Sequence, residues 1–79
     1  MKKLTDLKLG EVAIIDSFAS EDIYIKLLEM GCIPGEKIIV EQIAPLGDPI
    51  SVYVSGYRLS LRLSEADQIY VSAHSLISK

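Results

Sequence analysis

The sequence has no tryptophan, one cysteine, one histidine and one phenylalanine among its 79 residues. A single cysteine, Cys32, excludes an internal disulfide and indicates a reducing compartment. No pair of cysteines or histidines offers the spacing of a zinc site, and His74 stands alone in a polar segment, which is typical of a solvated surface residue. Four tyrosines and one phenylalanine are too few aromatic rings for a groove that binds proline-rich peptides.

Long apolar runs are also missing. No stretch approaches the roughly 20 apolar residues that span a bilayer. Asp6, Lys8 and Glu11 interrupt the segment in which a secretory leader would need its apolar run. We therefore expect a cytoplasmic protein that does not insert into a membrane directly. The net charge of −3 has the wrong sign for holding a phosphate backbone, so nucleic acid is not an expected partner.

The motifs of common enzymes are absent as well. There is no phosphate-binding glycine loop that ends in Lys-Ser or Lys-Thr, no dinucleotide fingerprint and no serine elbow between glycines. The paired acids Glu21-Asp22 and Glu65-Asp67 stand where expected helices begin, so helix capping explains them. We expect no enzyme, no catalytic residue, no cofactor and no resident metal. A divalent metal held transiently by carboxylates and His74 stays open as an alternative.

What is present predicts one small, mainly β domain over residues 1–79. Its core spans residues 4–71, and residues 72–79 are expected to form a loosely held tail. A first strand is predicted over residues 12–18 because β-branched residues are frequent there. A helix with its body over residues 23–30 follows, with Ser20 as its cap and Gly31 at its end.

The middle of the chain predicts a turn, a strand and a loop. Pro34 and Gly35 fit the two central positions of a type II turn. A strand over residues 37–44 should follow, but both of its faces carry apolar residues, so its core face is ambiguous and either curvature or a bulge is an expected solution. The two prolines that flank Leu46, Gly47 and Asp48 predict a loop that projects from the body.

The last third of the chain has a period of two. Residues 50–54 and 57–61 alternate apolar and polar side chains around a turn at Ser55-Gly56. The register that pairs Val52 with Leu59 places every apolar residue on one face and sets Tyr53 opposite Arg58 on the other. A short helical turn near residues 64–67 and a final strand at residues 69–71 complete the chain. About five short strands, one helix after the first strand and one helical turn before the last predict a small SH3-like barrel.

Two groups of residues are candidate contacts for a partner. Tyr53, Arg58 and Arg62 share the expected outer face of the hairpin, and Tyr and Arg are enriched at protein interfaces. Solvated arginines stacking on a tyrosine ring are an equally good explanation. The loop with Leu46, Gly47 and Asp48 is more plausible as a binding surface than as a phosphate or metal contact, since a lone acid repels phosphate.

Three segments together resemble the FeoA family, the small cytosolic component of bacterial ferrous iron transport. They are Lys26-Leu27-Leu28-Glu29-Met30-Gly31-Cys32-Ile33-Pro34-Gly35, Ala44-Pro45-Leu46-Gly47-Asp48-Pro49-Ile50 and Gly56-Tyr57-Arg58-Leu59-Ser60-Leu61-Arg62. Their order and spacing also match the family pattern, and the resemblance extends from Leu4 to Val71. In this reading Gly31, Pro34, Gly35 and Gly56 are structural residues of the motif.

The resemblance implies an SH3-like, non-enzymatic accessory protein that binds FeoB, a membrane permease with a cytoplasmic GTP-binding domain. Its effect would be on transport or on the GTP cycle, and its location would be cytoplasmic, peripheral to the inner membrane through its partner. A third small component of the same transport system is a further expected partner. The alternative function is a chaperone or sensor that binds ferrous iron or another divalent metal. The sequence also leaves open whether two copies pair as a homodimer.

Overall fold

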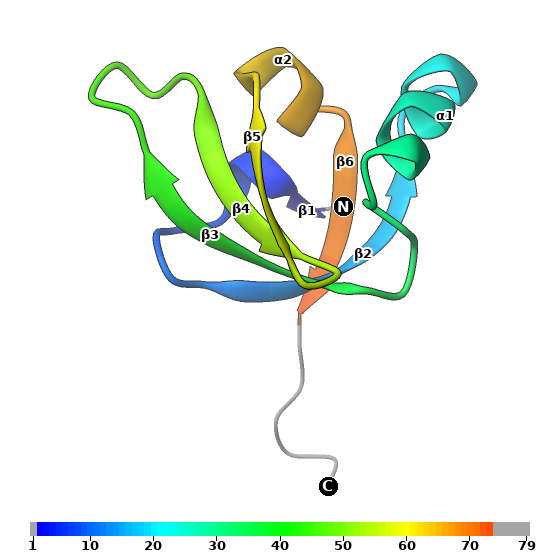
Figure 1. Ribbon diagram of the computed structural model, residues 1–79, viewed down its shortest axis with the longest axis horizontal. Coiled ribbons are helices and arrows are strands. Elements are labelled where there is room, and N and C mark those ends of the chain that lie inside the picture. The colour runs from blue at the N-terminus through cyan, green and yellow to red at the C-terminus, as the bar shows by residue number, and fades with distance from the viewer. Residues whose placement is uncertain (1, 74–79) are drawn as a thin grey trace, which may run out of the picture.

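The computed structural model describes residues 2–73. Its strands form one antiparallel sheet in the order β1-β6-β2-β3-β4-β5, and this sheet curls into a barrel (Figure 1). The elements in chain order are β1 Lys2–Lys3, the 3-10 helix η1 Leu4–Asp6, β2 Val12–Phe18, α1 Glu21–Glu29, β3 Lys37–Ile43, β4 Ile50–Val54, β5 Tyr57–Leu61, α2 Leu63–Ala66 and β6 Ile69–Ala73. The predicted mainly β class is confirmed, with one helix after the first long strand and a short helix before the last strand.

The barrel has one more strand than the sequence predicts. Strand β1 contains only Lys2 and Lys3, which pair with Val71 and Tyr70 of β6. Two lysines carry no apolar alternation, so periodicity cannot reveal this strand. Its pairing comes from backbone hydrogen bonds with β6, which are independent of side-chain type. The count of about five strands is therefore corrected to six.

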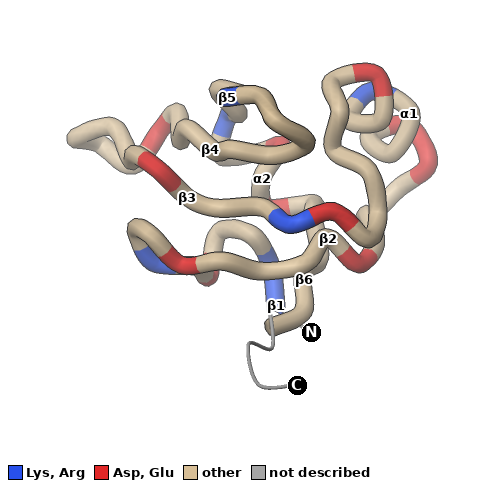
Figure 2. The backbone as a smooth tube through the Cα atoms, turned by 60° about the horizontal axis from the view of Figure 1, so that its bottom comes forward, with Lys and Arg blue, Asp and Glu red and all other residues tan. Residues whose placement is uncertain are grey.

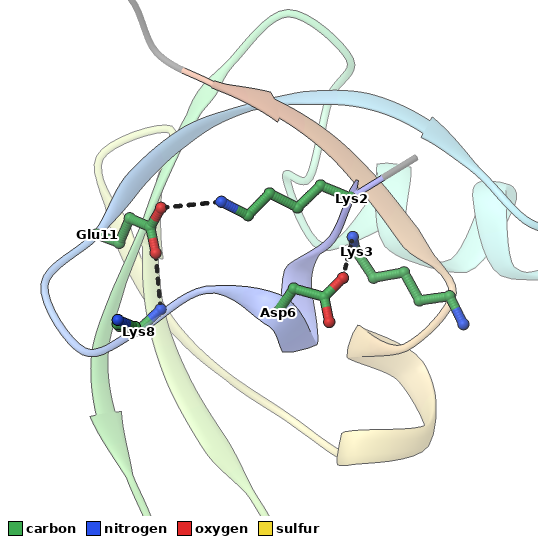
Figure 3. A network of polar contacts seen from close by, with 5 residues as sticks. All are labelled: Lys2, Lys3, Asp6, Lys8 and Glu11. Carbon is green, nitrogen blue, oxygen red and sulfur yellow. Dashed lines mark hydrogen bonds and ion pairs between the residues drawn. The ribbon is translucent and has the colours of Figure 1, made fainter.

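A network of polar contacts fixes the segment that follows β1 (Figure 3). The Lys3 backbone N–H donates to Asp6 Oδ2 at 2.9 Å. One carboxylate, that of Glu11, accepts from the Lys8 backbone N–H at 2.9 Å and from Lys2 Nζ at 3.1 Å. These two bonds hold the pKa of Glu11 below its usual value, and the bond from Lys8 has the larger effect. These contacts place η1 against the barrel, where Leu4 is fully buried.

The final strand is longer than the predicted residues 69–71. Strand β6 continues to Ala73, because Ser72 and Ala73 still pair with Ile14 and Ala13 of β2. The first two residues of the expected tail are thus part of the sheet, and residues 74–79 lie outside the described residues.

Helix α1 begins and ends as its sequence signals predict. The Ser20 hydroxyl accepts the Ile23 N–H at 3.4 Å, which caps the first turn. Gly31 has a φ of +96°, and its N–H donates to Leu28 O at 3.0 Å. The helix exit is therefore closed by a glycine in the left-handed region. No helix found between residues 2 and 73 is long and apolar enough to cross a membrane.

The ambiguous strand β3 contains the expected bulge. Its register against β4 shifts between Val40 and Gln42. Before the shift, Ile38 and Val40 point into the core with 0% and 1% exposure, whereas Ile43 beyond the shift is 42% exposed. The bulge thus resolves the conflict between the two apolar faces by turning the end of the strand away from the core.

The β4–β5 hairpin has the predicted register, with Val52 opposite Leu59 and Tyr53 opposite Arg58. Both turn residues have positive φ, as a two-residue type I′ turn requires: Ser55 at 53° and Gly56 at 84°. Tyr57 lies on the same face as the buried apolar residues but is 68% exposed. Val54 opposite it is only 1% exposed, so the core reaches the end of β4 while the Tyr57 side chain stays largely in water.

The core of residues 2–73 is wholly apolar, and no polar or charged residue among them is buried. It is made of Leu4, Leu7, Ala13, Ile15, Ile23, Leu27, Cys32, Ile38, Val40, Ile50, Val52, Val54, Leu61, Ala66, Ile69 and Val71. Because every strand from β2 to β6 contributes, the core fixes the relative position of the loops at both ends of the barrel.

Candidate functional site

The predicted contact residues fall into two groups in the structure. The β3–β4 loop, which carries Leu46, Gly47 and Asp48, lies at the same end of the barrel as α2 (Figure 1). Asp48 Oδ1 accepts the backbone N–H of Leu63 at 2.8 Å, and this bond ties the loop to the first residue of α2. Arg62 immediately precedes that residue, so the structure places its backbone beside the loop.

Tyr53 and Arg58 form the second group, as register partners on β4 and β5. Arg58 Nε donates to Glu41 Oε1 at 2.7 Å, so strand β3 adds a residue that the sequence analysis missed. This bond is the main reason why the pKa of Arg58 lies above its ordinary value. Arg58 is thus a positioned cation on the outer face of three neighbouring strands.

Arg62 does not join this second group. It lies four residues beyond Arg58, about 13 Å along an extended chain, and follows the end of β5. Its backbone N–H donates to Glu65 Oε1 at 2.9 Å at the start of α2. The Glu65 carboxylate also pairs with Lys26 of α1. The contact with Lys26 is the main cause that holds the pKa of Glu65 below its usual value, and the bond from the Arg62 N–H adds to it. Figure 2 shows basic and acidic residues interspersed along the chain rather than separated by sign.

An apolar hollow of about 250 Å³ opens under the β3–β4 loop. Its apolar lining comes from η1 and the turn after it, β3, β4 and α2, with Gly47 at its edge. These lining residues are Leu4, Leu7, Val40, Ile43, Ile50 and Leu63. Leu46 at the tip of the loop is 95% exposed. The hollow could not be predicted from the sequence because folding assembles it from five segments. The one available signal was Leu46, an apolar residue between the two prolines of the loop.

The residues expected to be structural, Gly31, Pro34, Gly35 and Gly56, lie at turns. The Glu36 N–H donates to Ile33 O at 3.0 Å and Gly35 has a φ of +96°, as a type II turn around Pro34 and Gly35 requires. Gly35 N–H also donates to Ile15 O at 2.8 Å, which attaches the turn to β2. Gly56 supplies the second positive φ of the hairpin turn.

No group of three or more His, Cys, Asp or Glu side chains that could hold a metal ion is found within residues 2–73. His74, the candidate imidazole ligand, lies outside the described residues. Cys32 is fully buried, and burial, with a smaller effect from Glu65, raises the pKa of its thiol to about 11. A thiol in this environment stays protonated and is a core side chain rather than a nucleophile or metal ligand.

The fold and these loops define a small SH3-like barrel of one family. Residues 2–73 match the family model described as "FeoA domain", and the chain belongs to the FeoA family. The FeoA protein of Chlorobium tepidum, solved in solution, is 39% identical with a TM-score of 0.84, over 92% of this chain and 70% of that one. FeoA of Stenotrophomonas maltophilia, solved with zinc and described as an SH3 domain protein, is 31% identical with a TM-score of 0.77, over 91% of each chain. The predicted SH3-like fold and family are thereby confirmed.

A relative in Porphyromonas gingivalis joins two proteins in one chain. It is described as a fusion of Fe(2+) transport protein A with the Fe(2+) transporter FeoB, and it is 37% identical over 70 residues. The match covers 87% of this chain but spans only 8% of the length of that relative. The rest of the relative thus has no counterpart in this chain.

Proposed function

We propose that this protein is a non-enzymatic accessory of ferrous iron uptake that binds an FeoB-type permease and modulates its transport or its GTP cycle. The observation that carries the proposal is the fusion in Porphyromonas gingivalis of an FeoA-type relative with the transporter FeoB. A covalent link keeps two domains at a high effective concentration, which is useful when the two domains act on each other. We expect this chain and an FeoB-type permease to associate through the corresponding surfaces without such a covalent link.

The surface of the barrel fits a docking role. At one end of the barrel the β3–β4 loop presents Leu46, which is 95% exposed. On the outer face of β5 the exposed Arg58 is held in place by Glu41. Interfaces are commonly built from such an apolar anchor with positioned charges around it. We expect Leu46, Gly47, Asp48 and Arg62 to form one part of the contact with the permease, and Tyr53 and Arg58 to form the other. Through this contact the protein would be held in the cytoplasm at the inner membrane.

Binding of the full chain to the detergent-solubilised permease from the same organism tests the proposal. The measurement is made with a non-hydrolysable GTP analogue, with GDP and without nucleotide. Saturable binding whose affinity depends on the nucleotide is the expected result. Absence of binding in every nucleotide state, with both proteins folded and the third small component of the transport system added, would contradict the proposal.

The predicted alternative, direct binding of a divalent metal, has its own test. Anaerobic calorimetry with ferrous ion alone and the full chain, including His74, measures the stoichiometry and the dissociation constant. One ion per chain with a dissociation constant below about 1 μM, a free energy of about −8 kcal/mol, would favour a metal chaperone or sensor. Heats no larger than those of dilution would favour the accessory role.

A further inference from the structure

The hollow under the β3–β4 loop has the shape of a socket for a single side chain. Two of its lining residues, Ile43 and Leu63, are about two-fifths exposed at its mouth, whereas the residues at its floor, such as Leu4, are buried. An apolar cavity of about 150 Å³ accommodates a benzene ring, so a hollow of about 250 Å³ has room for one Leu, Met or Phe side chain. Leu46 stands next to Gly47 at its edge and remains almost fully in water.

Negative charge lies directly beside this hollow. Leu63 separates it from a second, shallower hollow that is lined by Thr5, Asp48, Ser64 and Asp67. Asp67 is partly neutralised, since Lys3 Nζ lies 3.6 Å from its Oδ1 and the Thr5 hydroxyl donates to the same atom at 3.1 Å. No ion pair of Asp48 is found in the part of the chain that the structure describes, and its only hydrogen bond found there is with the Leu63 N–H.

We propose that the hollow under the β3–β4 loop binds one bulky apolar side chain of the FeoB-type permease, and that a Lys or Arg next to that side chain pairs with Asp48. The inference rests on the proposed function and names the chemistry of the docking segment. The apolar side chain of the permease is transferred from water into the hollow, and Leu46 packs over it from the loop. The Asp48 carboxylate favours a permease segment that has a basic residue next to that side chain. A buried apolar anchor of this kind commonly contributes a large share of the affinity of a small interface.

Charge decides between this occupant and two others. Two copies of this chain that met at the loop would bring Asp48 close to its counterpart, and both copies carry a net charge of −3. Like charges at a contact oppose association. An anionic membrane surface would be repelled by the same carboxylate, because such surfaces attract basic segments. A segment with one apolar and one basic residue is attracted by both features.

Four single variants of the full chain test the proposal, with binding to the detergent-solubilised permease as the readout. Leu46→Ser removes the exposed side chain, and Leu63→Trp closes the mouth of the hollow with its own ring. Asp48→Asn removes the charge but keeps an oxygen that accepts the Leu63 N–H. Ile25→Ser is the control, since Ile25 is 54% exposed on α1, away from the loop and from Arg58. Thermal unfolding of each variant confirms that it is folded.

We expect Leu46→Ser and Leu63→Trp to weaken binding by about 10-fold to 30-fold, which corresponds to about 1.4 to 2 kcal/mol. Asp48→Asn should weaken it by about threefold at low salt, with a smaller effect at high salt because the attraction is screened. Ile25→Ser should bind like the unmodified protein. This pattern would support the socket.

Three results would overturn the inference and are distinguishable from failure of the proposed function. If the unmodified protein binds the permease and the three loop variants bind equally well, the socket is wrong and the accessory role stands. If Ile25→Ser weakens binding as much as Leu46→Ser, exposed apolar residues contribute without a specific site, and the socket is again wrong. If the unmodified protein does not bind the permease in any nucleotide state, the proposed function fails and the inference fails with it. Concentration-dependent dimerisation that Leu46→Ser abolishes would identify a second copy as the occupant and overturn the permease segment.

Discussion

The Ser55 hydroxyl donates a hydrogen bond of 2.7 Å to the backbone carbonyl oxygen of Gly31. This bond joins the tip of the β4–β5 hairpin to the exit of α1, two segments separated by 24 residues. Both residues have positive φ, 53° at Ser55 and 96° at Gly31. Two turns that are each fixed by local backbone conformation are thus also fixed to each other.

Ser55→Ala should lower the free energy of unfolding by about 1 kcal/mol, because the carbonyl of Gly31 loses its partner in a partly buried place. Urea denaturation followed by circular dichroism measures the change. Ser60→Ala is the matched control, since Ser60 is exposed on β5, and its effect should stay within about 0.5 kcal/mol. Equal stability of the two variants would show that the bond between hairpin and helix contributes nothing.

Gly31→Val should destabilise the protein by about 1 to 2 kcal/mol or more through its backbone conformation. A Cβ atom at this position would lie 3.9 Å from Ser55 Cβ, an ordinary contact, so the strain comes from φ rather than from a clash. Gly31→Asn is the control, because Asn tolerates the left-handed region better than a β-branched residue. If Val and Asn lower the melting temperature equally, the conformational explanation is wrong.

Glu65→Gln should reduce stability at pH 7 by about 1 kcal/mol, since the carboxylate pairs with Lys26 and accepts the Arg62 N–H. These contacts lower the pKa of Glu65 in the folded state, so its charged form stabilises the fold above the unfolded pKa. That contribution is lost as pH falls through the folded pKa. The difference between Glu65→Gln and the unmodified protein should therefore shrink as pH is lowered from neutral through the acidic range.

The control for this prediction is Glu29→Gln, which makes the same chemical change at an exposed position of α1. Its stability relative to the unmodified protein should vary less with pH. A difference for Glu65→Gln that stays constant between pH 7 and strongly acidic conditions would show that the ion pair with Lys26 does not stabilise the fold.

Cys32 should resist alkylation in the folded protein. Its side chain is fully buried and its thiol has a pKa of about 11, so the reactive thiolate is scarce at pH 8. We expect iodoacetamide to modify the native protein at least about 100-fold more slowly than the protein in urea. Mass spectrometry of timed samples measures both rates. Similar rates would mean that the environment of Cys32 is open to water.

Arg62→Glu should weaken binding to the permease while leaving the fold intact. The N-terminus of α2, which Arg62 precedes, is compatible with a negative charge, so the fold is kept. The expected loss of affinity comes from a contact of the Arg62 cation with an acid of the permease, separate from the basic residue that pairs with Asp48. Lys37→Glu changes the net charge equally at the other end of β3, and it should weaken binding less than Arg62→Glu does. Unchanged affinity of a folded Arg62→Glu variant would remove Arg62 from the interface.

The hairpin shows how much of the fold the sequence predicts. The alternation of residues 50–54 and 57–61 leaves only one register that keeps Val52 and Leu59 on the core face, and the structure has that register. The capping of α1 is equally local, since Ser20 and Gly31 act on backbone groups within a few residues. Such features are predictable because their physical cause lies in neighbouring residues.

Other features depend on contacts between distant segments and could not be predicted. Strand β1 has no side-chain pattern, and its pairing depends on where β6 lies. The predicted outer group of Tyr53, Arg58 and Arg62 is divided, because β5 ends at Leu61 before Arg62 is reached. Glu41, the partner of Arg58, comes from a strand whose orientation was ambiguous until the bulge was known. The candidate contact residues therefore stay a prediction, and their arrangement could be known only from the structure.

The pairing of β1 with β6 also bears on how this fold can be used as a module. Lys2 lies opposite Val71, so the first and last strands of the described chain run side by side at one edge of the sheet. A polypeptide attached before β1 and another attached after β6 would start from neighbouring points of that edge. The β3–β4 loop extends from other strands and would not be interrupted by either attachment. Such a barrel can be inserted into or appended to a longer polypeptide as a cassette, with its proposed socket left accessible.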